Sequence, residues 1–300
     1  MPAVALVALV LGCGSVHDPA PTRSASALPA GGTGTVEVAG RPVTLHVPES
    51  YDPGRPAPLV IALHGYTSNA AELESYLRLT PEADRRGFVY AYPDGSTAAR
   101  GERFWNATDA CCAFSASKPD DSGYLSELIT TIQSTYRIDR ARVYVLGHSN
   151  GGFMSLRMAC DHADQITAVA TLNGATWQDA GLCRPSEPVS VLAIHSTADE
   201  TVAYAGGTIG RATYPSAATT LARWVAYDRC TDAGSDGPPL DLVTDLPGAE
   251  TAVHTYTQGC AGGSTVAAWT INGGRHVPRL DAGFARAVTD FLLSTAKPAR

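Results

Sequence analysis

Four stretches of the chain are continuously apolar and end at or just before a glycine or a polar residue. They are residues 58–65 (PLVIALHG), 142–147 (RVYVLG), 168–174 (AVATLNG) and 189–195 (VSVLAIH). Such runs belong to strands that are covered on both faces, as in a parallel sheet. Helical periodicity lies between them: residues 124–136 place apolar side chains on one stripe, with Asp121 or Ser122 available as the N-cap, and residues 284–292 repeat the pattern. This alternation predicts one open α/β sheet with helices on both sides.

The length and composition of the chain fit a single folded domain after the N-terminal segment. Residues 35–38 and 43–47 alternate apolar and polar side chains, as half-buried antiparallel strands do. At 300 residues the length alone would allow two domains, but the chain has neither an internal repeat nor a second linker. A content of 44% hydrophobic and 17% charged residues excludes intrinsic disorder, and a net charge of −7 argues against nucleic acid as a partner. We therefore expect one domain over residues 35–300.

The N-terminus has the pattern of a targeting segment. Residues 2–12 form an apolar run that is too short for a membrane span, which needs about 20 residues, but fits a signal peptide. The run ends at Cys13 in Val-Leu-Gly-Cys, which resembles a bacterial lipobox, so residues 1–13 predict a signal peptide with Cys13 as the lipidated residue. Residues 14–34 are rich in Pro, Ala, Ser and Gly, as linkers are. We expect a secreted protein or one tethered outside the cell membrane, with membrane contact only through the lipid.

The most specific local signal is Gly147-His-Ser149-Asn-Gly151, which matches G-x-S-x-G directly after an apolar strand and before a helical run. In this setting the motif is a nucleophile elbow. The serine lies on a turn so tight that the flanking residues must stay small, hence the glycines. The following helix directs its N-terminus at the serine and favours developing negative charge there. Ser149 is therefore the predicted nucleophile.

A serine nucleophile needs a base and an orienting acid, which follow it in the order Ser, Asp, His in this fold. Asp199 comes just after the strand VSVLAIH, and His276 follows the next apolar run, TVAAWTI. We predict that His276 accepts the serine proton and that Asp199 fixes its tautomer. Glu200 is the alternative acid. His148 is expected to point away from the nucleophile and pack, and His195 to be a satisfied core histidine.

Stabilisation of an oxyanion requires two backbone N–H groups. One should come from the loop after the first core strand, Leu63-His-Gly-Tyr66, and the other from the residue after the nucleophile. Tyr66 and Asn150 are the predicted donors. Because both donate from the backbone, the Tyr66 ring is free to cover the acyl group of a substrate.

With these motifs placed, the chain from about Thr35 to its C-terminus resembles the secreted serine esterases that unite polyhydroxybutyrate depolymerases, feruloyl esterases and acetyl xylan esterases. Besides the elbow, the motifs that carry the resemblance are PLVIALHG at 58–65, Trp105-Asn106 followed by Cys111-Cys112, DDSGY at 120–124, HSTAD at 195–199 and GGRH at 273–276. The resemblance implies an α/β-hydrolase fold without a large lid domain.

The chain departs from this family at the histidine loop. The family commonly reads G-G-H-x-W-P, whereas here His276-Val277-Pro278 is one residue shorter and has no tryptophan. One aromatic wall of the substrate site is expected to be missing, and the triad is unaffected. Trp105 and Trp177 lie in loops at the predicted catalytic edge, so they are candidate substrate contacts; packed loop anchors are the alternative. Asp120 and Asp121 are expected to act as a helix cap and a loop clasp.

Six cysteines remain besides Cys13, and six allow 15 pairings. Proximity suggests Cys160–Cys183, and Cys230–Cys260 would close the Gly/Pro-rich insertion at residues 231–250. This leaves Cys111 and Cys112 as a vicinal disulfide or as two free thiols. No metal-binding spacing such as CxxC or HExxH occurs in the sequence, so we expect no metal and no cofactor.

The sequence thus predicts a monomeric serine carboxylesterase that works outside the cytoplasm through a covalent acyl-enzyme. Feruloyl or acetyl esters of plant polysaccharide are the favoured substrates, and polyhydroxybutyrate is the alternative. Two further hypotheses are a serine peptidase of the same fold and a carbohydrate-binding lipoprotein that has lost catalysis. The intact Ser-Asp-His set speaks against the last one.

Overall fold

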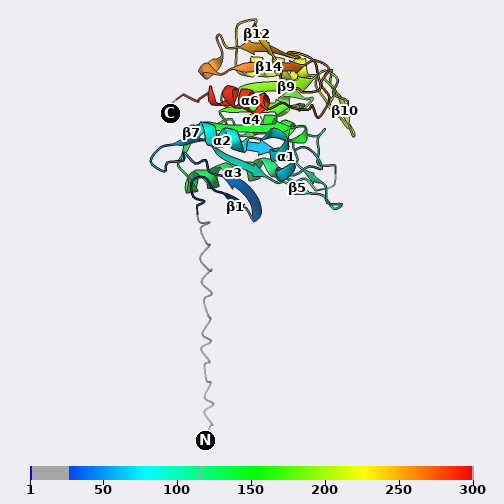
Figure 1. Ribbon diagram of the computed structural model, residues 1–300. Helices are drawn as coiled ribbons and strands as arrows, with labels where there is room; N and C mark the ends of the chain where they lie inside the picture. Colours follow the sequence, from blue (N-terminus) through cyan, green and yellow to red (C-terminus); the bar gives the residue numbers. More distant parts are fainter. Residues whose placement is uncertain (2–26, 115–116, 299–300) are drawn as a thin grey trace.

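The computed structural model describes Met1, residues 27–114 and residues 117–298 (Figure 1). Its centre is a ten-stranded sheet in the order β1-β2-β4-β3-β7-β8-β9-β14-β13-β12. The six strands from β4 to β14 in this order run parallel to one another, and two antiparallel strands flank them on each side. The strands are Thr33–Val38 (β1), Arg41–His46 (β2), Ala57–Leu63 (β3), Val89–Pro93 (β4), Ile138–His148 (β7), Ala168–Leu172 (β8), Ser190–Ser196 (β9), Ser235–Leu240 (β12), Thr251–Tyr256 (β13) and Val266–Ile271 (β14).

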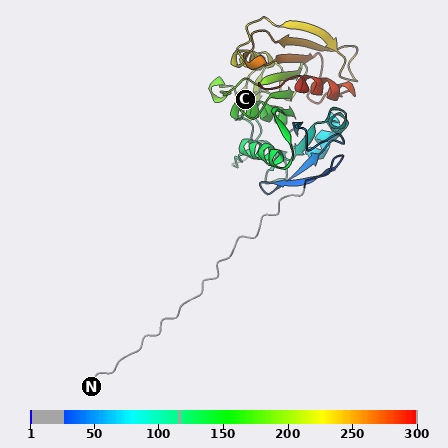
Figure 2. The same ribbon diagram turned by 90° about the vertical axis from the view of Figure 1, so that its left-hand side faces the viewer.

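Helices cover both faces of the sheet, with α1, α2 and α6 on one side and α3 and α4 on the other (Figure 2). The helices are Ala70–Leu77 (α1), Thr80–Arg86 (α2), Asp121–Thr135 (α3), Asn150–Asp161 (α4), Ala217–Tyr227 (α5) and Gly283–Leu293 (α6), with short 3₁₀ turns at Ala180–Leu182 and Ala261–Gly263. Two small hairpins lie outside the sheet: Ser96–Thr97 (β5) with Arg103–Phe104 (β6), and Gly207–Ile209 (β10) with Ala212–Tyr214 (β11).

Each face of the sheet has its own apolar core because successive side chains of a strand point to opposite faces. In β3, Leu59, Ile61 and Leu63 pack into the core beneath α3, α4 and α5. Val60 and Ala62 of the same strand belong to the other core, beneath α1, α2 and α6. The continuous apolar run of this strand therefore reflects burial on both faces, which confirms the predicted fold class.

The four continuous apolar runs coincide with β3, β7, β8 and β9. The cap of α3 is neither Asp121 nor Ser122, the two candidates from helical periodicity, but it agrees with the expectation that Asp120 and Asp121 form a helix cap and a loop clasp. The N-cap is Asp120, whose side chain accepts a hydrogen bond from the backbone N–H of Gly123. Asp121 and Ser122 are buried inside the first turn instead. The carboxylate of Asp121 forms an ion pair with Arg41 at 3.1 Å. Because Asp121 is engaged there, the residue before it caps the helix.

The Gly/Pro-rich insertion contains a strand that periodicity did not reveal. Residues Ser235–Leu240 pair with β13 at the edge of the sheet, with a register shift between Gly237 and Leu240. An edge strand tolerates proline because one side of its backbone has no partner strand. The insertion therefore extends the sheet rather than forming a separate unit.

Two disulfides tie the ends of helices to neighbouring loops. Cys160–Cys183 joins the end of α4 to the segment before β9, and Cys230–Cys260 joins the segment after α5 to the loop before β14. These are the two longer pairs that sequence proximity suggested. The predicted signal peptide, Cys13 and most of the predicted linker lie outside the described residues. Within the described part of the chain, no helix is long and apolar enough to cross a membrane.

Candidate active site

Ser149 occupies a tight turn between β7 and α4. Its φ of +55° lies in the left-handed region that L-residues rarely adopt, and its backbone N–H donates to the carbonyl oxygen of Leu172 at 2.8 Å. A Cβ added to Gly147 would lie 2.0 Å from the carbonyl oxygen of Gly151, and one added to Gly151 would lie 1.9 Å from that of Leu63. Only glycine fits at these two positions, which is the steric reason for the motif.

The structure brings Ser149, His276 and Asp199 into one chain of hydrogen bonds. The distance from His276 Nε2 to Ser149 Oγ is 2.8 Å, and the distance from His276 Nδ1 to Asp199 Oδ2 is 2.8 Å. A carboxylate only accepts hydrogen bonds, so Nδ1 carries the proton and Nε2 is the acceptor that faces the serine hydroxyl. The three side chains come from the ends of three strands of the sheet, β7, β9 and β14.

Asp199 is held by the backbone of its own loop. Its Oδ1 accepts hydrogen bonds from the backbone N–H groups of Thr201 and Val202, both at 2.8 Å. His195 supports the same loop, because its Nε2 donates to the carbonyl oxygen of Val202 at 2.8 Å. Burial lowers the pKa of His195. This matches the interpretation of His195 as a satisfied core histidine.

Glu200 lies beside the histidine without contacting its ring in a hydrogen bond. Its Oε2 accepts from the backbone N–H of His276 at 3.3 Å, whereas Asp199 faces the imidazole. The geometry therefore favours Asp199 over Glu200 as the orienting acid.

Two side chains donate hydrogen bonds to the backbone carbonyl of His276. Asn173 Nδ2 donates to its carbonyl oxygen at 2.8 Å, and His148 Nε2 donates to the same oxygen at 2.9 Å. The His148 ring also packs between those of Tyr76 and His276, with centroid distances of 5.4 Å and 5.2 Å. Burial lowers the pKa of His148 to about 4, so this ring is neutral near pH 7. Sequence reasoning placed His148 as packed and missed its contact with the histidine loop.

The position of Asn173 in the sequence indicates that it lies near the active site. It directly follows the apolar strand β8, at the same edge where Ser149 and Asp199 follow theirs. Its φ of +54° is one that asparagine tolerates better than most residues. A polar residue that directly follows a parallel strand is therefore a candidate for a place beside the triad.

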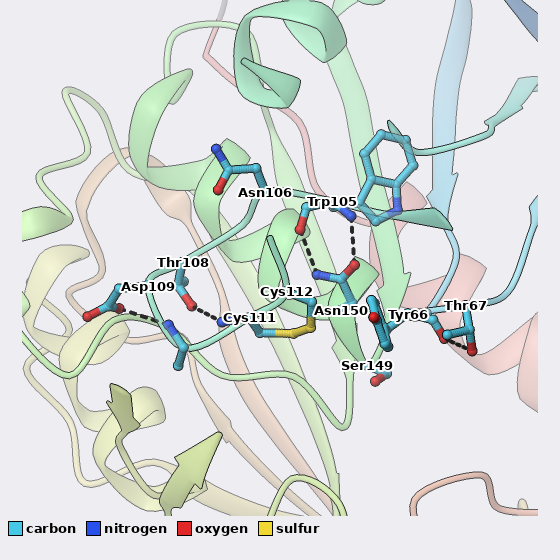
Figure 3. Close-up of a disulfide and its surroundings, with 12 residues drawn as sticks. Tyr66, Thr67, Trp105, Asn106, Thr108, Asp109, Cys111, Cys112, Ser149 and Asn150 are labelled. Carbon is cyan, nitrogen blue, oxygen red and sulfur yellow. Dashed lines mark hydrogen bonds between the residues drawn. A yellow bond between two sulfur atoms is a disulfide. The ribbon is translucent and has the colours of Figure 1, made fainter. Parts of the chain in front are cut away.

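Tyr66 and Asn150, the two predicted oxyanion donors, lie close to Ser149 (Figure 3). A Cβ on Gly65 would lie 3.4 Å from Ser149 Cβ, so the loop before Tyr66 runs against the nucleophile. The side chain of Asn150 pairs with the backbone of Trp105, accepting from its N–H at 2.7 Å and donating to its carbonyl at 2.9 Å. This pairing ties the residue after the nucleophile to the Trp105 loop.

The two tryptophans that the sequence suggests as substrate contacts both pack into the surrounding loops. Trp105 is completely buried, and its Nε1 donates to the carbonyl oxygen of His64 at 3.1 Å. Trp177 is 8% exposed and lies under the guanidinium group of Arg157, 5.8 Å from the ring centroid. The complete burial of Trp105 matches the alternative of a packed loop anchor. Trp177 is as exposed as Ser149 and His276, so its contact with a substrate stays a prediction.

A buried carboxylate fastens the Trp105 loop. Asp121 pairs with Arg41 and accepts hydrogen bonds from Ser96 Oγ at 2.7 Å and from the backbone N–H of Asn106 at 2.8 Å. It is thus the expected loop clasp, and through Trp105 it supports the residue after the nucleophile. No group of three or more His, Cys, Asp or Glu side chains in the described ranges is arranged to hold a metal ion.

Cys111 and Cys112 form a disulfide in the loop that follows Trp105. Of the two alternatives left by the sequence, the structure has the vicinal disulfide. Figure 3 shows it close to Asn150 and Ser149. Both cysteines are buried, at 2% and 5% exposure, and Cys111 N–H donates to Thr108 Oγ1 at 3.2 Å.

Comparisons with known proteins agree with this geometry. Residues 44–225 match the family described as esterase PHB depolymerase. Feruloyl esterase B of Piromyces equi is 30% identical over 79% of this chain, which spans only 42% of that protein. Feruloyl esterase D of Neurospora crassa is 28% identical over 93% of this chain and 86% of its own length. The solved structure of an acetyl xylan esterase from Aspergillus awamori superimposes with a TM-score of 0.60 at 14% identity, over 87% of this chain and 99% of that one, which shows a shared fold.

Proposed function

Because the chain belongs to the esterase PHB depolymerase family, we propose that it is a serine carboxylesterase that acts through Ser149, His276 and Asp199. The observation that carries the proposal is the position of His276, which lies 2.8 Å from Ser149 Oγ and 2.8 Å from Asp199 Oδ2. No other histidine among the described residues contacts a serine and a carboxylate at the end of the parallel strands.

In the proposed reaction Ser149 Oγ attacks the ester carbonyl carbon while His276 Nε2 takes the hydroxyl proton. The carbonyl oxygen becomes an oxyanion, which the backbone N–H groups of Tyr66 and Asn150 stabilise. His276 then gives its proton to the leaving alcohol oxygen, and the bond between that oxygen and the carbonyl carbon breaks. Water repeats the sequence on the acyl-enzyme and releases the acid, which restores Ser149. Asp199 stays ionised and stabilises the imidazolium.

The favoured substrates are feruloyl or acetyl esters of plant polysaccharide, since the relatives above are feruloyl esterases and the fold is shared with an acetyl xylan esterase. The family description favours a polyester such as polyhydroxybutyrate as the second candidate. Action outside the cytoplasm is supported by three disulfides, which persist in oxidising compartments. A predicted signal peptide and Cys13 as lipid anchor belong to the same proposal.

Replacing the nucleophile tests the mechanism. We expect Ser149→Ala to lower turnover of p-nitrophenyl butyrate by about 10⁴-fold or more, because no other group supplies the attacking oxygen. Ser134→Ala, which removes an exposed hydroxyl on α3, is the matched control and should keep full activity. Equal turnover in the two variants would refute Ser149 as the nucleophile.

A further inference from the structure

The disulfide between Cys111 and Cys112 differs in what it joins from the disulfides at the ends of α4 and α5. Its cysteines are neighbours in the sequence, whereas the other two bonds have sequence separations of 23 and 30. A cross-link stabilises a fold mainly by restricting the unfolded chain, and this effect grows with the length of the closed loop. A bond between neighbours restricts the unfolded chain very little. Its effect is local, because the ring that it closes contains the backbone between the two residues.

The backbone of this disulfide is hydrogen-bonded to the Trp105 loop. The backbone N–H of Cys112 donates to the carbonyl oxygen of Trp105 at 3.2 Å, and the carbonyl oxygen of Cys111 accepts from the backbone N–H of Thr108 at 2.7 Å. The same Trp105 oxygen accepts from Asn150 Nδ2 at 2.9 Å (Figure 3). One backbone oxygen therefore connects the disulfide to the residue after the nucleophile.

Asn150 lies where a small displacement matters. It is the first residue of α4, directly follows Ser149 and is completely buried. Its Oδ1 also accepts from the backbone N–H of Trp105 at 2.7 Å, so both ends of its amide are bound to one residue. Because the side chain and the backbone of a buried residue move together, the Trp105 backbone sets the position of the Asn150 N–H. This N–H is one of the two predicted oxyanion donors, which act only when they are already in place.

We propose that the Cys111–Cys112 disulfide positions the oxyanion donor Asn150 and that reduction of this disulfide slows ester hydrolysis. The inference rests on the proposed serine esterase function. While the disulfide is closed, the backbone of Cys112 keeps the Trp105 carbonyl in place for Asn150. Reduction opens the ring, and the backbone gains conformations in which that carbonyl and Asn150 are displaced. A displacement of about 1 Å in a catalytic site costs up to about 100-fold in rate.

A recess in the surface gives a small dithiol access to this disulfide. Cys112 lines a cavity of about 370 Å³ together with Tyr66, Phe104 and Phe114. A thiolate of the dithiol attacks one sulfur, which forms a mixed disulfide and releases the other cysteine as a thiolate. The second thiol of the reagent then displaces the first cysteine. The protein gains two electrons and two protons, and the dithiol becomes a cyclic disulfide.

A pair of serine substitutions tests the positioning role without a reductant. We would measure kcat and KM for p-nitrophenyl butyrate with the purified full chain, well below the unfolding midpoint of each variant. Cys111→Ser combined with Cys112→Ser should lower kcat about tenfold or more with little change in KM. Cys230→Ser combined with Cys260→Ser is the matched control, because that disulfide joins the segment after α5 to the loop before β14. The control should lower the unfolding midpoint and keep kcat. An unchanged kcat in the first pair, or an equal loss in both pairs, would overturn the proposal.

A second comparison tests whether the disulfide acts through Asn150. Asn150→Ala removes the side chain that binds Trp105 and should itself lower kcat. Adding the serine pair to Asn150→Ala should then lower kcat by less than about threefold more, because the connection is already broken. If the two losses multiply in full, the disulfide acts by another route and the positioning of Asn150 is refuted.

Reduction of the wild-type protein covers the case in which the serine pair does not fold. The native protein is treated with dithiothreitol and alkylated, and mass spectrometry gives the reduced fraction of each disulfide. kcat should fall with the reduction of Cys111 and Cys112 and return after reoxidation with oxidised glutathione. Resistance of this disulfide to dithiothreitol, or full kcat after its reduction, would contradict the proposal. Failure of the esterase function itself looks different, because Ser149→Ala would then keep full turnover of p-nitrophenyl butyrate.

Discussion

The two edges of the parallel sheet both bury ionisable side chains, but they use them differently. At the carboxyl edge, His276 forms one hydrogen bond of 2.8 Å with Asp199 and another of 2.8 Å with Ser149, and the three residues follow separate strands. At the amino edge, Asp228 and Lys297 are bound to neighbouring chain segments. Asp228 Oδ1 accepts from the backbone N–H of Val189 at 3.2 Å, and Lys297 Nζ pairs with Glu187 at 2.6 Å and with a backbone carbonyl.

The contrast shows that a buried ionisable group is weak evidence for catalysis by itself. Burial raises the pKa of Asp228 to about 6, and a shift of this size near neutral pH is often taken as a functional sign. Yet within the described residues Asp228 has no histidine partner, and the groups beside it are the backbone N–H of Val189 and the hydroxyl of Ser264. A chain of hydrogen bonds between side chains from several strand ends distinguishes the carboxyl edge.

The largest expected effect is on kcat, and it distinguishes Asp199 from Glu200 at the carboxyl edge of the sheet. Asp199→Asn should lower kcat by about 10⁴-fold. The backbone N–H groups of Thr201 and Val202 would hold the amide oxygen, so the amide NH2 would face Nδ1 and favour the wrong tautomer of His276. Glu200→Gln is the control, since Glu200 contacts only the backbone N–H of His276. It should keep most of its activity in the same assay. A greater loss in Glu200→Gln would reassign the acid.

The next effect concerns stability at the amino edge. Because the pKa of Asp228 is raised in the folded state from its ordinary 3.8 to about 6, folding binds a proton and the stability from this group is full below pH 4. It is lost as the pH rises through 6, at a cost of up to about 3 kcal/mol. Asp228→Asn should therefore raise the free energy of unfolding at pH 8 and have little effect at pH 4.

Denaturant unfolding of the variant at both pH values measures this difference. Asp245→Asn, which changes an exposed aspartate, is the matched control and should leave the stability unchanged. kcat should stay unchanged in Asp228→Asn, because Asp228 lies at the amino edge and accepts a hydrogen bond from Val189, not from a member of the proposed triad. A stabilisation equal at pH 4 and pH 8, or a loss of kcat, would contradict the assignment.

The smallest effect tests the support of His276. His148→Phe removes one of the two hydrogen bonds to the His276 carbonyl while keeping a ring against Tyr76, so kcat should fall about tenfold with little change in KM. His148→Gln, which can still donate a hydrogen bond, should recover part of the loss. An unchanged kcat, or a loss that Gln does not restore, would make His148 a packing residue only.

Sequence patterns located the triad because each member follows an apolar strand, and strand ends of a parallel sheet share one edge. They did not predict that His148 and Asn173 support His276. Both side chains bind a backbone carbonyl, and every residue has one, so no motif in the sequence marks this contact. The complete burial of Trp105 could not be predicted, because position along the chain does not reveal which loops cover a side chain.

For a related reason, helical periodicity alone indicated Asp121 or Ser122 as the cap of α3, whereas the cap is Asp120. Asp120 and Asp121 are equivalent in local propensity, and only the distant Arg41 decides that Asp121 turns inward. The strand at Ser235–Leu240 escaped detection because its prolines are acceptable only at an edge, and its place at the edge depends on the pairing with β13. Long-range contacts determine each of these features.

The most direct measurement of the proposed chemistry is covalent labelling of the native protein with a fluorophosphonate, followed by mass spectrometry of its peptides. A serine whose hydroxyl is activated by His276 should form one phosphonyl adduct, on the peptide that contains Ser149, and Ser149→Ala should abolish it. The exposed Ser134 should remain unlabelled. A folded protein that hydrolyses p-nitrophenyl butyrate but carries no adduct on Ser149, or carries it on another serine, would contradict the proposed triad.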